Sequence, residues 1–172
     1  MARNIEIKAY VPDLDAVRST AASMSSTAGV VVDQTDTFFA VPKGRLKVRE
    51  FGDGSGELIA YDRPDASGPK ESVYTRVRCD DAAEVAHALG TVLGVRGQVR
   101  KHREVFLIGR TRVHLDEVEH LGSFVELEVV LDDHDDVEAG RRDAELLMKA
   151  LSISPSTLVS GAYIDLLERS AR

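Results

Sequence analysis

The chain has 172 residues, of which 43% are hydrophobic and 30% are charged, as is ordinary for one folded domain over residues 1–172. Its net charge of −7 argues against a general nucleic-acid binder. No apolar run approaches the ~20 residues of a membrane-spanning helix, and the first residues lack the apolar stretch of a signal peptide. A single cysteine, Cys79, excludes a disulfide framework. We therefore expect a cytoplasmic domain with no membrane or nucleic-acid partner.

Charge is distributed unevenly along the chain. Residues 43–112 contain fourteen Lys and Arg against ten Asp and Glu, whereas residues 116–145 contain twelve acidic residues and two basic ones. The two regions could be surface patches that balance each other. They could also converge on one site, where cations bind phosphate and carboxylates bind a metal. Net charge alone does not decide between these interpretations.

Hydrophobic periodicity predicts about eight strands and four helices. In chain order, the expected elements are strand 3–11, helix 13–26 capped by Asp13, strands 30–41, 45–51, 57–63 and 72–78, helix 81–94 capped by Asp80-Asp81, strands 98–108, 111–118 and 123–131, and helices 136–151 and 155–169. Short strands joined by hairpin turns favour an antiparallel sheet over repeated βαβ units. A closed or nearly closed barrel would leave few exposed strand edges.

Several predicted strands carry apolar residues on one face and charged residues on the other. Lys47 and Arg49 alternate with apolar neighbours, and Glu126 and Glu128 project together from a later strand. Antiparallel sheets usually have one polar, solvated face, and this alone can explain the pattern. However, the signs of the charges are segregated by strand, and two neighbouring carboxylates repel unless a cation lies between them. Mg²⁺, which takes oxygen ligands, would fit there.

Four further positions carry specific expectations. Arg49 and Arg103 have no acidic partner at their own strand positions, so we predict that both charges are available to bind phosphate oxygens. His114 shares a strand face with Asp116, but the five histidines show no metal-ligand spacing, which favours a structural role. Tyr163, on the last predicted helix, is interpreted as packing against the barrel.

Six short motifs occur in the order found in one known family. They are N-I-E-I-K at 4–8, D-T-F-F at 36–39, G-R-L-K-V-R at 44–49, K-x-R at 101–103, T-R-V-H-L-D at 111–116 and F-V-E-L-E at 124–128. In these motifs the chain resembles the CYTH proteins, which include class IV adenylyl cyclases and thiamine triphosphatases and belong to the triphosphate tunnel metalloenzymes. The resemblance runs from Asn4 to about Leu167 and is strongest to the class IV adenylyl cyclase branch.

The resemblance implies an α+β fold, an eight-stranded antiparallel β-barrel with flanking helices and a charged tunnel inside. It also implies Mg²⁺ or Mn²⁺ as the cofactor and a small-molecule triphosphate or diphosphate as the partner, and it leaves a homodimer open. The metal ligands that it implies are Glu6, Asp116, Glu126 and Glu128. The substrate-binding residues that it implies are Lys8, Lys47, Arg49, Arg63, Arg76, Lys101 and Arg103, with Lys8, Arg49 and Arg103 also acting in catalysis.

Two positions depart from the family's pattern. Asn4 stands where the first motif usually begins with Glu, which removes a negative charge from the metal end. Phe38 stands where the triphosphatase branch carries a Tyr thought to pair with a nearby Lys, and strand 57–63 contains no Lys. The leading hypothesis is therefore a cyclase that converts ATP to cyclic AMP and pyrophosphate. The alternatives are a triphosphatase for thiamine triphosphate, tripolyphosphate or another organic polyphosphate, and a non-catalytic polyphosphate-binding module.

Overall fold

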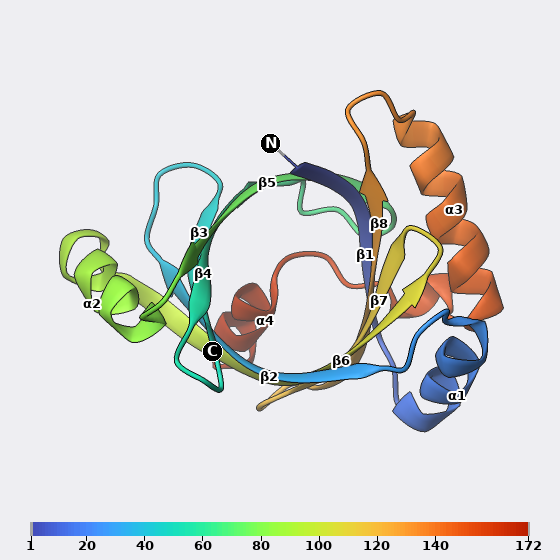
Figure 1. The fold of residues 1–172 in the computed structure, drawn as a ribbon, viewed down its shortest axis with the longest axis horizontal. Coiled ribbons are helices and arrows are strands. Elements are labelled where there is room, and N and C mark those ends of the chain that lie inside the picture. Colours follow the sequence, from blue (N-terminus) through green and yellow to red (C-terminus); the bar gives the residue numbers. More distant parts are fainter. Residues whose placement is uncertain (1, 172) are drawn as a thin grey trace.

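The computed structural model of the protein describes residues 2–171. Its strands are β1 (Ala2–Tyr10), β2 (Val30–Phe39), β3 (Arg45–Phe51), β4 (Gly56–Asp62), β5 (Lys70–Cys79), β6 (Val95–Ile108), β7 (Thr111–Val118) and β8 (Gly122–Leu131). Its helices are α1 (Leu14–Met24), α2 (Ala82–Leu93), α3 (Val137–Ala150) and α4 (Tyr163–Ser170), with a 3₁₀ turn at Pro155–Thr157. The strands form a closed antiparallel barrel in the order β1-β5-β4-β3-β2-β6-β7-β8 (Figure 1). This confirms the α+β barrel expected from the sequence.

Much of the hydrophobic core lies on the outer surface of the barrel, beneath helices. Helices α1 and α3 pack against β1, β7 and β8, where Ile7, Val113 and Leu127 are fully buried (Figure 1). Helix α2 covers β2, β3 and β4 through a cluster that includes Val48 and Ala82. Side chains alternate between the two faces of a strand, so apolar outer positions leave the inward positions free for polar side chains.

Aspartates begin three of the helices, two of them at the caps that the sequence predicts. Asp13 accepts two hydrogen bonds of 3.1 Å from the first turn of α1, Asp81 accepts one of 2.9 Å from α2, and Asp136 caps α3. Each carboxylate satisfies backbone N–H groups that have no partner within the helix, and it lies favourably at the positive end of the helix dipole. No helix within residues 2–171 is both long enough and apolar enough to cross a membrane.

The expected helix over residues 155–169 is wrong in its first half. After the 3₁₀ turn the chain is extended, and the N–H of Val159 donates to the carbonyl of Lys8 on β1 at 2.8 Å. Gly161, with a φ of 85°, then turns the chain into α4. Pairing with β1 satisfies backbone groups that a helix would satisfy internally, and periodicity along one segment cannot anticipate a partner so far away in sequence.

Helix α4 lies within the ring of strands and closes one end of its interior (Figure 1). Tyr163 and Ile164 belong to a buried cluster with Phe38 and Phe124, which come from strands on different sides of the barrel. Gly97 on β6 permits this approach, because a Cβ atom there would lie 2.7 Å from the Cδ1 of Ile164. The last helix therefore forms the closed end of the space inside the barrel.

Candidate active site

The inward faces of the strands enclose a charged cavity of about 280 Å³. All seven cations expected to bind substrate line it, together with Glu6, Glu126 and Glu128. Among the described residues that line it, eight are cationic and five are carboxylates, so the cavity has a positive balance. The side chain of Arg76 is 47% exposed and that of Lys101 only 1%, which places the open end near the first and the closed end near the second.

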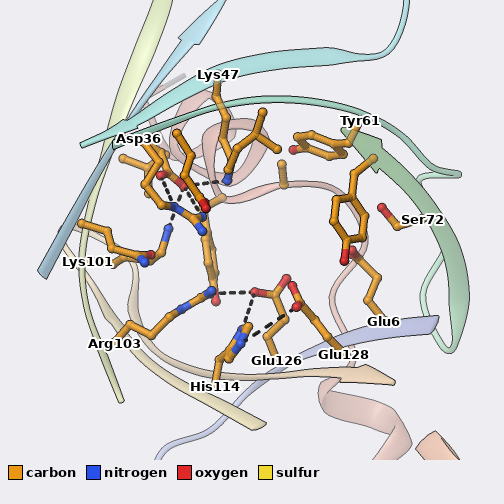
Figure 2. A pocket seen from close by; sticks show the side chains of 18 of the residues that line it. Glu6, Asp36, Lys47, Tyr61, Ser72, Lys101, Arg103, His114, Glu126 and Glu128 are labelled. Carbon is orange, nitrogen blue, oxygen red and sulfur yellow. Dashed lines mark hydrogen bonds and ion pairs between the residues drawn. The ribbon is translucent and has the colours of Figure 1, made fainter. Parts of the chain in front are cut away.

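Asp36, Lys47, Arg49 and Lys101 form what we call the Asp36 cluster. Figure 2 shows Asp36, Lys47 and Lys101 of this cluster. The ammonium groups of Lys47 and Lys101 each donate to Asp36 at 2.7 Å. Arg49 donates to the same carboxylate through Nε at 2.8 Å and Nη2 at 3.0 Å. The expectation that Arg49 has no acidic partner is therefore wrong. The register of β2 and β3 pairs Arg49 directly with Asp36, which sequence spacing within one strand cannot reveal.

Sharing one carboxylate among three cations shifts the pKa values in the Asp36 cluster. Burial alone would raise the pKa of Asp36, but the charges of Arg49, Lys101 and Lys47 hold it well below its usual value. Burial, assisted by the neighbouring Arg49, lowers the pKa of Lys47 to about 8. Burial also lowers the pKa of Lys101 well below its ordinary value. A bound polyanion would therefore stabilise the charged form of each lysine.

Arg103 joins two carboxylates at the closed end of the cavity. Its Nε and Nη2 each donate to Asp116 at 2.6 Å, and Nη2 also donates to Glu126 at 2.7 Å. The expectation that Arg103 lacks an acidic partner is also wrong, because the register of β6 and β7 pairs it with Asp116. The hydroxyl of Tyr163 donates to Asp116 as well, at 2.7 Å. Asp116 is fully buried, and these donors occupy both oxygens of this predicted metal ligand.

His114, Glu126 and Glu128 form what we call the carboxylate cluster (Figure 2). Each offers a ligand atom within 4.8 Å of the others, the geometry of a candidate metal site. His114 is 4% exposed, and its Nδ1 lies 3.7 Å from Glu126 and has no hydrogen-bond partner within residues 2–171. Carboxylate oxygens suit Mg²⁺ and Mn²⁺, and imidazole nitrogen suits several transition metals. These residues therefore fit a divalent cation, with His114 added to the predicted ligands.

Cations keep the carboxylate cluster ionised. The ammonium of Lys8 lies 3.6 Å from Glu126, and Arg103 contacts the other oxygen of the same carboxylate. Burial would raise the pKa of Glu126, but Lys8, His114 and Arg103 hold it well below its usual value. Burial would likewise raise the pKa of Glu128, but His114 and Arg112 lower it instead. Both carboxylates are therefore charged, as metal ligands must be, near neutral pH.

Glu6, another predicted metal ligand, has a different set of partners. It forms an ion pair of 2.9 Å with Arg63, which also donates to the carbonyl of Gly161 at 3.0 Å. The register pairs Glu6 with Lys70, a buried ammonium with no hydrogen-bond partner among the described residues. Burial, reinforced by the charge of Glu126, raises the pKa of Glu6. A cation bound nearby would stabilise its charged form.

Four residues of the site were not among those predicted: Asp36, Arg112, His114 and Tyr163. Arg112 donates to Glu128 at 2.9 Å. Arg112 and His114 are the second and fourth residues of β7 and share a strand face with Asp116, the sixth, so strict alternation could have identified both. Tyr163 had no comparable signal, because it reaches the site from a helix that enters the end of the barrel.

Sequence comparisons identify a matching family and a similar protein. The profile of the CYTH domain family matches residues 2–163. The adenylate cyclase CyaB of Aeromonas hydrophila is 26% identical over 175 residues, covering 96% of this chain and 89% of that protein.

Solved structures share the fold. The PH1012 protein of Pyrococcus horikoshii OT3 has a TM-score of 0.84 at 20% identity, covering 95% of this chain and 98% of that one. HpAC1 of Hippeastrum, described as having a dominant triphosphatase activity, has a TM-score of 0.67 at 17% identity, covering 100% and 97% of the two chains. With its barrel, its charged interior and a family match over nearly its whole length, the chain belongs to the CYTH family.

Proposed function

We propose that this protein is a metal-dependent enzyme that acts on an organic triphosphate, and that it converts ATP to cyclic AMP and pyrophosphate. One observation carries the proposal: the Asp36 cluster and the carboxylate cluster line the same closed barrel (Figure 2). A polyphosphate needs cations around its oxygens, and its cleavage needs negative charge to be stabilised as the leaving group departs. The two clusters together supply both requirements.

The cations have distinct proposed roles. Those proposed to bind the substrate are Lys8, Lys47, Arg49, Arg63, Arg76, Lys101 and Arg103. Arg49 and Arg103 present paired N–H donors, a geometry that matches two phosphate oxygens at once. Together with Lys8 they are proposed to stabilise the charge that develops on the departing pyrophosphate. Since Asp36 is shared by three cations, its charge does not neutralise all of them, and an entering phosphate meets uncompensated positive charge.

The proposed ligands of Mg²⁺ or Mn²⁺ are Glu126, Glu128 and His114. Glu6 and Asp116, implied by the family resemblance, stay predictions, and Asp116 would have to release donors from Arg103 and Tyr163 to take part. A bound divalent cation supplies charge neutralisation at the phosphate oxygens. The protein's own contribution is to hold the two carboxylates of β8 ionised and oriented, beside His114 on the neighbouring strand β7.

Two observations favour the cyclase over a triphosphatase. The relative with the adenylate cyclase name spans nearly the whole chain. In addition, Phe38 lines the cavity with its ring 5.4 Å from Lys47 and has no hydroxyl with which to orient a water. A cyclase needs no attacking water, because the 3′-hydroxyl of the substrate attacks the α-phosphorus. A triphosphatase, in which water attacks the terminal phosphorus, is the second candidate, and the activity described for HpAC1 favours it.

A small-molecule triphosphate is the proposed partner, rather than nucleic acid or a membrane. A cytoplasmic location is proposed with it, where ATP and divalent cations are both available. A homodimer stays a prediction from the family resemblance.

Product analysis tests this function. The purified protein is incubated with ATP, thiamine triphosphate or tripolyphosphate, each with Mg²⁺ or Mn²⁺, and the products are separated by anion-exchange chromatography. Cyclic AMP with pyrophosphate is the expected result, orthophosphate would identify a triphosphatase, and binding without turnover would identify a binding module. Glu126→Gln should abolish turnover, whereas Arg142→Ala, whose side chain is 65% exposed on α3, should leave it unchanged.

A further inference from the structure

One part of the cavity wall carries no charge. Asn4, Tyr61, Ser72 and Tyr74 line the cavity from β1, β4 and β5, and we call them the neutral wall. The register makes them contiguous, because it pairs Asn4 with Ser72 and Tyr61 with Tyr74. Figure 2 shows Tyr61 and Ser72 on the side of the cavity opposite Lys101 and Arg103. The neutral wall therefore lies across the cavity from Lys101 and Arg103. Its aromatic rings border other cations of the site, since Lys47 and Arg63 lie 5.8 and 5.9 Å from the ring of Tyr61.

An unpartnered acceptor lies within the neutral wall. Asn4 and Ser72 are each only 3% exposed. The Oδ1 atom of Asn4 is buried and accepts no hydrogen bond from any described residue. Leaving a buried acceptor without a donor is unfavourable by roughly 1–3 kcal/mol, so native proteins rarely keep one without a ligand or water that supplies the donor. Asn4 lines the cavity of about 280 Å³, where a ligand could supply that donor.

Aromatic rings extend the neutral wall toward the open end of the cavity. Tyr74 is partly exposed, and its ring lies 5.6 Å from the guanidinium of Arg76 near that end. Its hydroxyl accepts a 3.4 Å hydrogen bond from Arg112, which leaves the ring as the part of the side chain available for stacking. A flat group on a triphosphate could therefore lie along Tyr74 while the phosphates reach the deeper cations.

We propose that the neutral wall is the subsite for the organic group of the substrate, and that it selects a flat heteroaromatic ring bearing a hydrogen-bond donor. This inference rests on the proposed function, because it assumes that the phosphates occupy the charged parts of the same cavity. The exocyclic amino group of an adenine-type base supplies the donor that Asn4 lacks, and an asparagine amide matches the adjacent donor and acceptor of such a base. The phenol rings supply stacking, which any heteroaromatic ring can use.

Three ligands separate the contributions of the phosphates, the ring and the amino group to the binding affinity. Tripolyphosphate has no organic group, purine riboside triphosphate has the ring without the amino group, and ATP has both. Affinities are measured by titration calorimetry with EDTA present, so that no turnover occurs. The unmodified protein is expected to bind ATP about 3- to 10-fold more tightly than purine riboside triphosphate, the range for one neutral hydrogen bond.

The variants assign these differences to residues. Asn4→Leu should weaken the binding of ATP by about 3- to 10-fold and leave the affinities for the other two ligands unchanged. Tyr74→Leu should weaken the binding of both nucleotides by about fivefold or more, and Tyr74→Phe should preserve their affinities. Gln34→Met removes a second cavity amide, whose Oε1 also has no hydrogen-bond partner among the described residues but which lies on β2, outside the neutral wall. It should not alter the ratio of ATP to tripolyphosphate affinity. An unchanged tripolyphosphate affinity in each variant also shows that the barrel is intact.

The possible failures are distinguishable. If the unmodified protein does not bind tripolyphosphate, the proposed function is wrong and this inference falls with it. If tripolyphosphate binds but Asn4→Leu and Tyr74→Leu leave the relative affinities of the three ligands unchanged, the proposed function stands and the neutral wall is not the subsite.

Discussion

The Asp36 cluster and the carboxylate cluster line one cavity but balance charge in opposite ways. In the first, three cations converge on one carboxylate at 2.7–3.0 Å. In the second, two carboxylates lie beside a histidine whose Nδ1 has no hydrogen-bond partner among the described residues. The Asp36 cluster therefore has positive charge that can bind an anion, whereas the carboxylate cluster has atoms that can ligate a cation.

This difference explains how one barrel can bind two ligands of opposite charge, a polyphosphate and a divalent cation. Arg103 lies between the two clusters and binds Glu126 of the second, so each cluster is partly neutralised before any ligand enters. Taking a charge out of water is unfavourable unless it is paired. The residual imbalance within each cluster, rather than the total charge of the cavity, then decides which ligand it binds.

The largest expected effect comes from removing the shared carboxylate. Asp36→Ala leaves three buried cations together, and we expect it to lower the free energy of unfolding by roughly 3–5 kcal/mol, the range for breaking a buried ion pair. Tripolyphosphate should recover more stability in this variant than in the unmodified protein, because it replaces the missing negative charge. Urea unfolding with and without tripolyphosphate measures both quantities.

Asp33→Ala is the matched control on the same strand. The side chain of Asp33 is 77% exposed and contacts His102, so its loss should change stability by no more than about 0.5 kcal/mol. Equal stability of the Asp33 and Asp36 variants would contradict the view that the Asp36 cluster is a buried charge network.

Two arginines that look alike in the sequence should behave differently. Arg49→Ala leaves Asp36 with two lysine partners, so its main effect should be weaker tripolyphosphate binding, by at least ~1.5–3 kcal/mol. Arg103→Ala removes the donors of both Asp116 and Glu126, so it should also lower stability. Arg49→Lys should recover only part of the binding, because an ammonium cannot copy the paired donors.

Titration calorimetry with tripolyphosphate and urea unfolding together separate these effects. Arg142→Ala, on the outer helix α3, should alter neither. Unchanged tripolyphosphate affinity in Arg49→Ala would mean that the Asp36 cluster only stabilises the barrel.

A smaller effect is expected at the carboxylate cluster. His114→Asn should weaken Mn²⁺ binding by about tenfold or more, since even partners of metal ligands contribute this much. Tripolyphosphate binding without metal should stay unchanged, because the charged partners of His114 among the described residues are Glu126 and Glu128, outside the Asp36 cluster. Mn²⁺ titration followed by electron paramagnetic resonance measures the first quantity. His134→Asn, on the exposed loop before α3, is the control, and equal losses in both variants would remove His114 from the metal site.

The smallest effect concerns pH. Because the pKa of Lys47 lies at about 8, this side chain loses its charge as the pH rises past that value. Tripolyphosphate affinity should therefore fall above pH 8, by at most about tenfold per pH unit for one proton. Lys47→Met should show a shallower decline than the unmodified protein, and the ligand's own titration cancels in this comparison. Identical pH profiles would show that Lys47 does not bind the phosphates.

The sequence by itself determined the local features of this protein. The strands expected at 45–51 and 111–118 have those bounds in the structure, and the aspartate caps are where the pattern predicts them. Alternation alone left a solvated polar face open, and it was the motif resemblance that assigned seven cations to the interior; all seven line the cavity. The strand bounds and the caps depend on residues within one turn or one strand of each other, which is why they can be seen in a single segment.

Only the tertiary structure decided which charges meet. Asp36 binds Arg49, and Asp116 binds Arg103, through strand pairings that join residues 13 apart along the chain. Tyr163 reaches Asp116 from 47 residues away, because the segment before α4 pairs with β1 instead of continuing as a helix. Closure of the barrel turns a polar face that would otherwise be solvated into an enclosed site, and it is this enclosure that makes the pairing of each charge decisive.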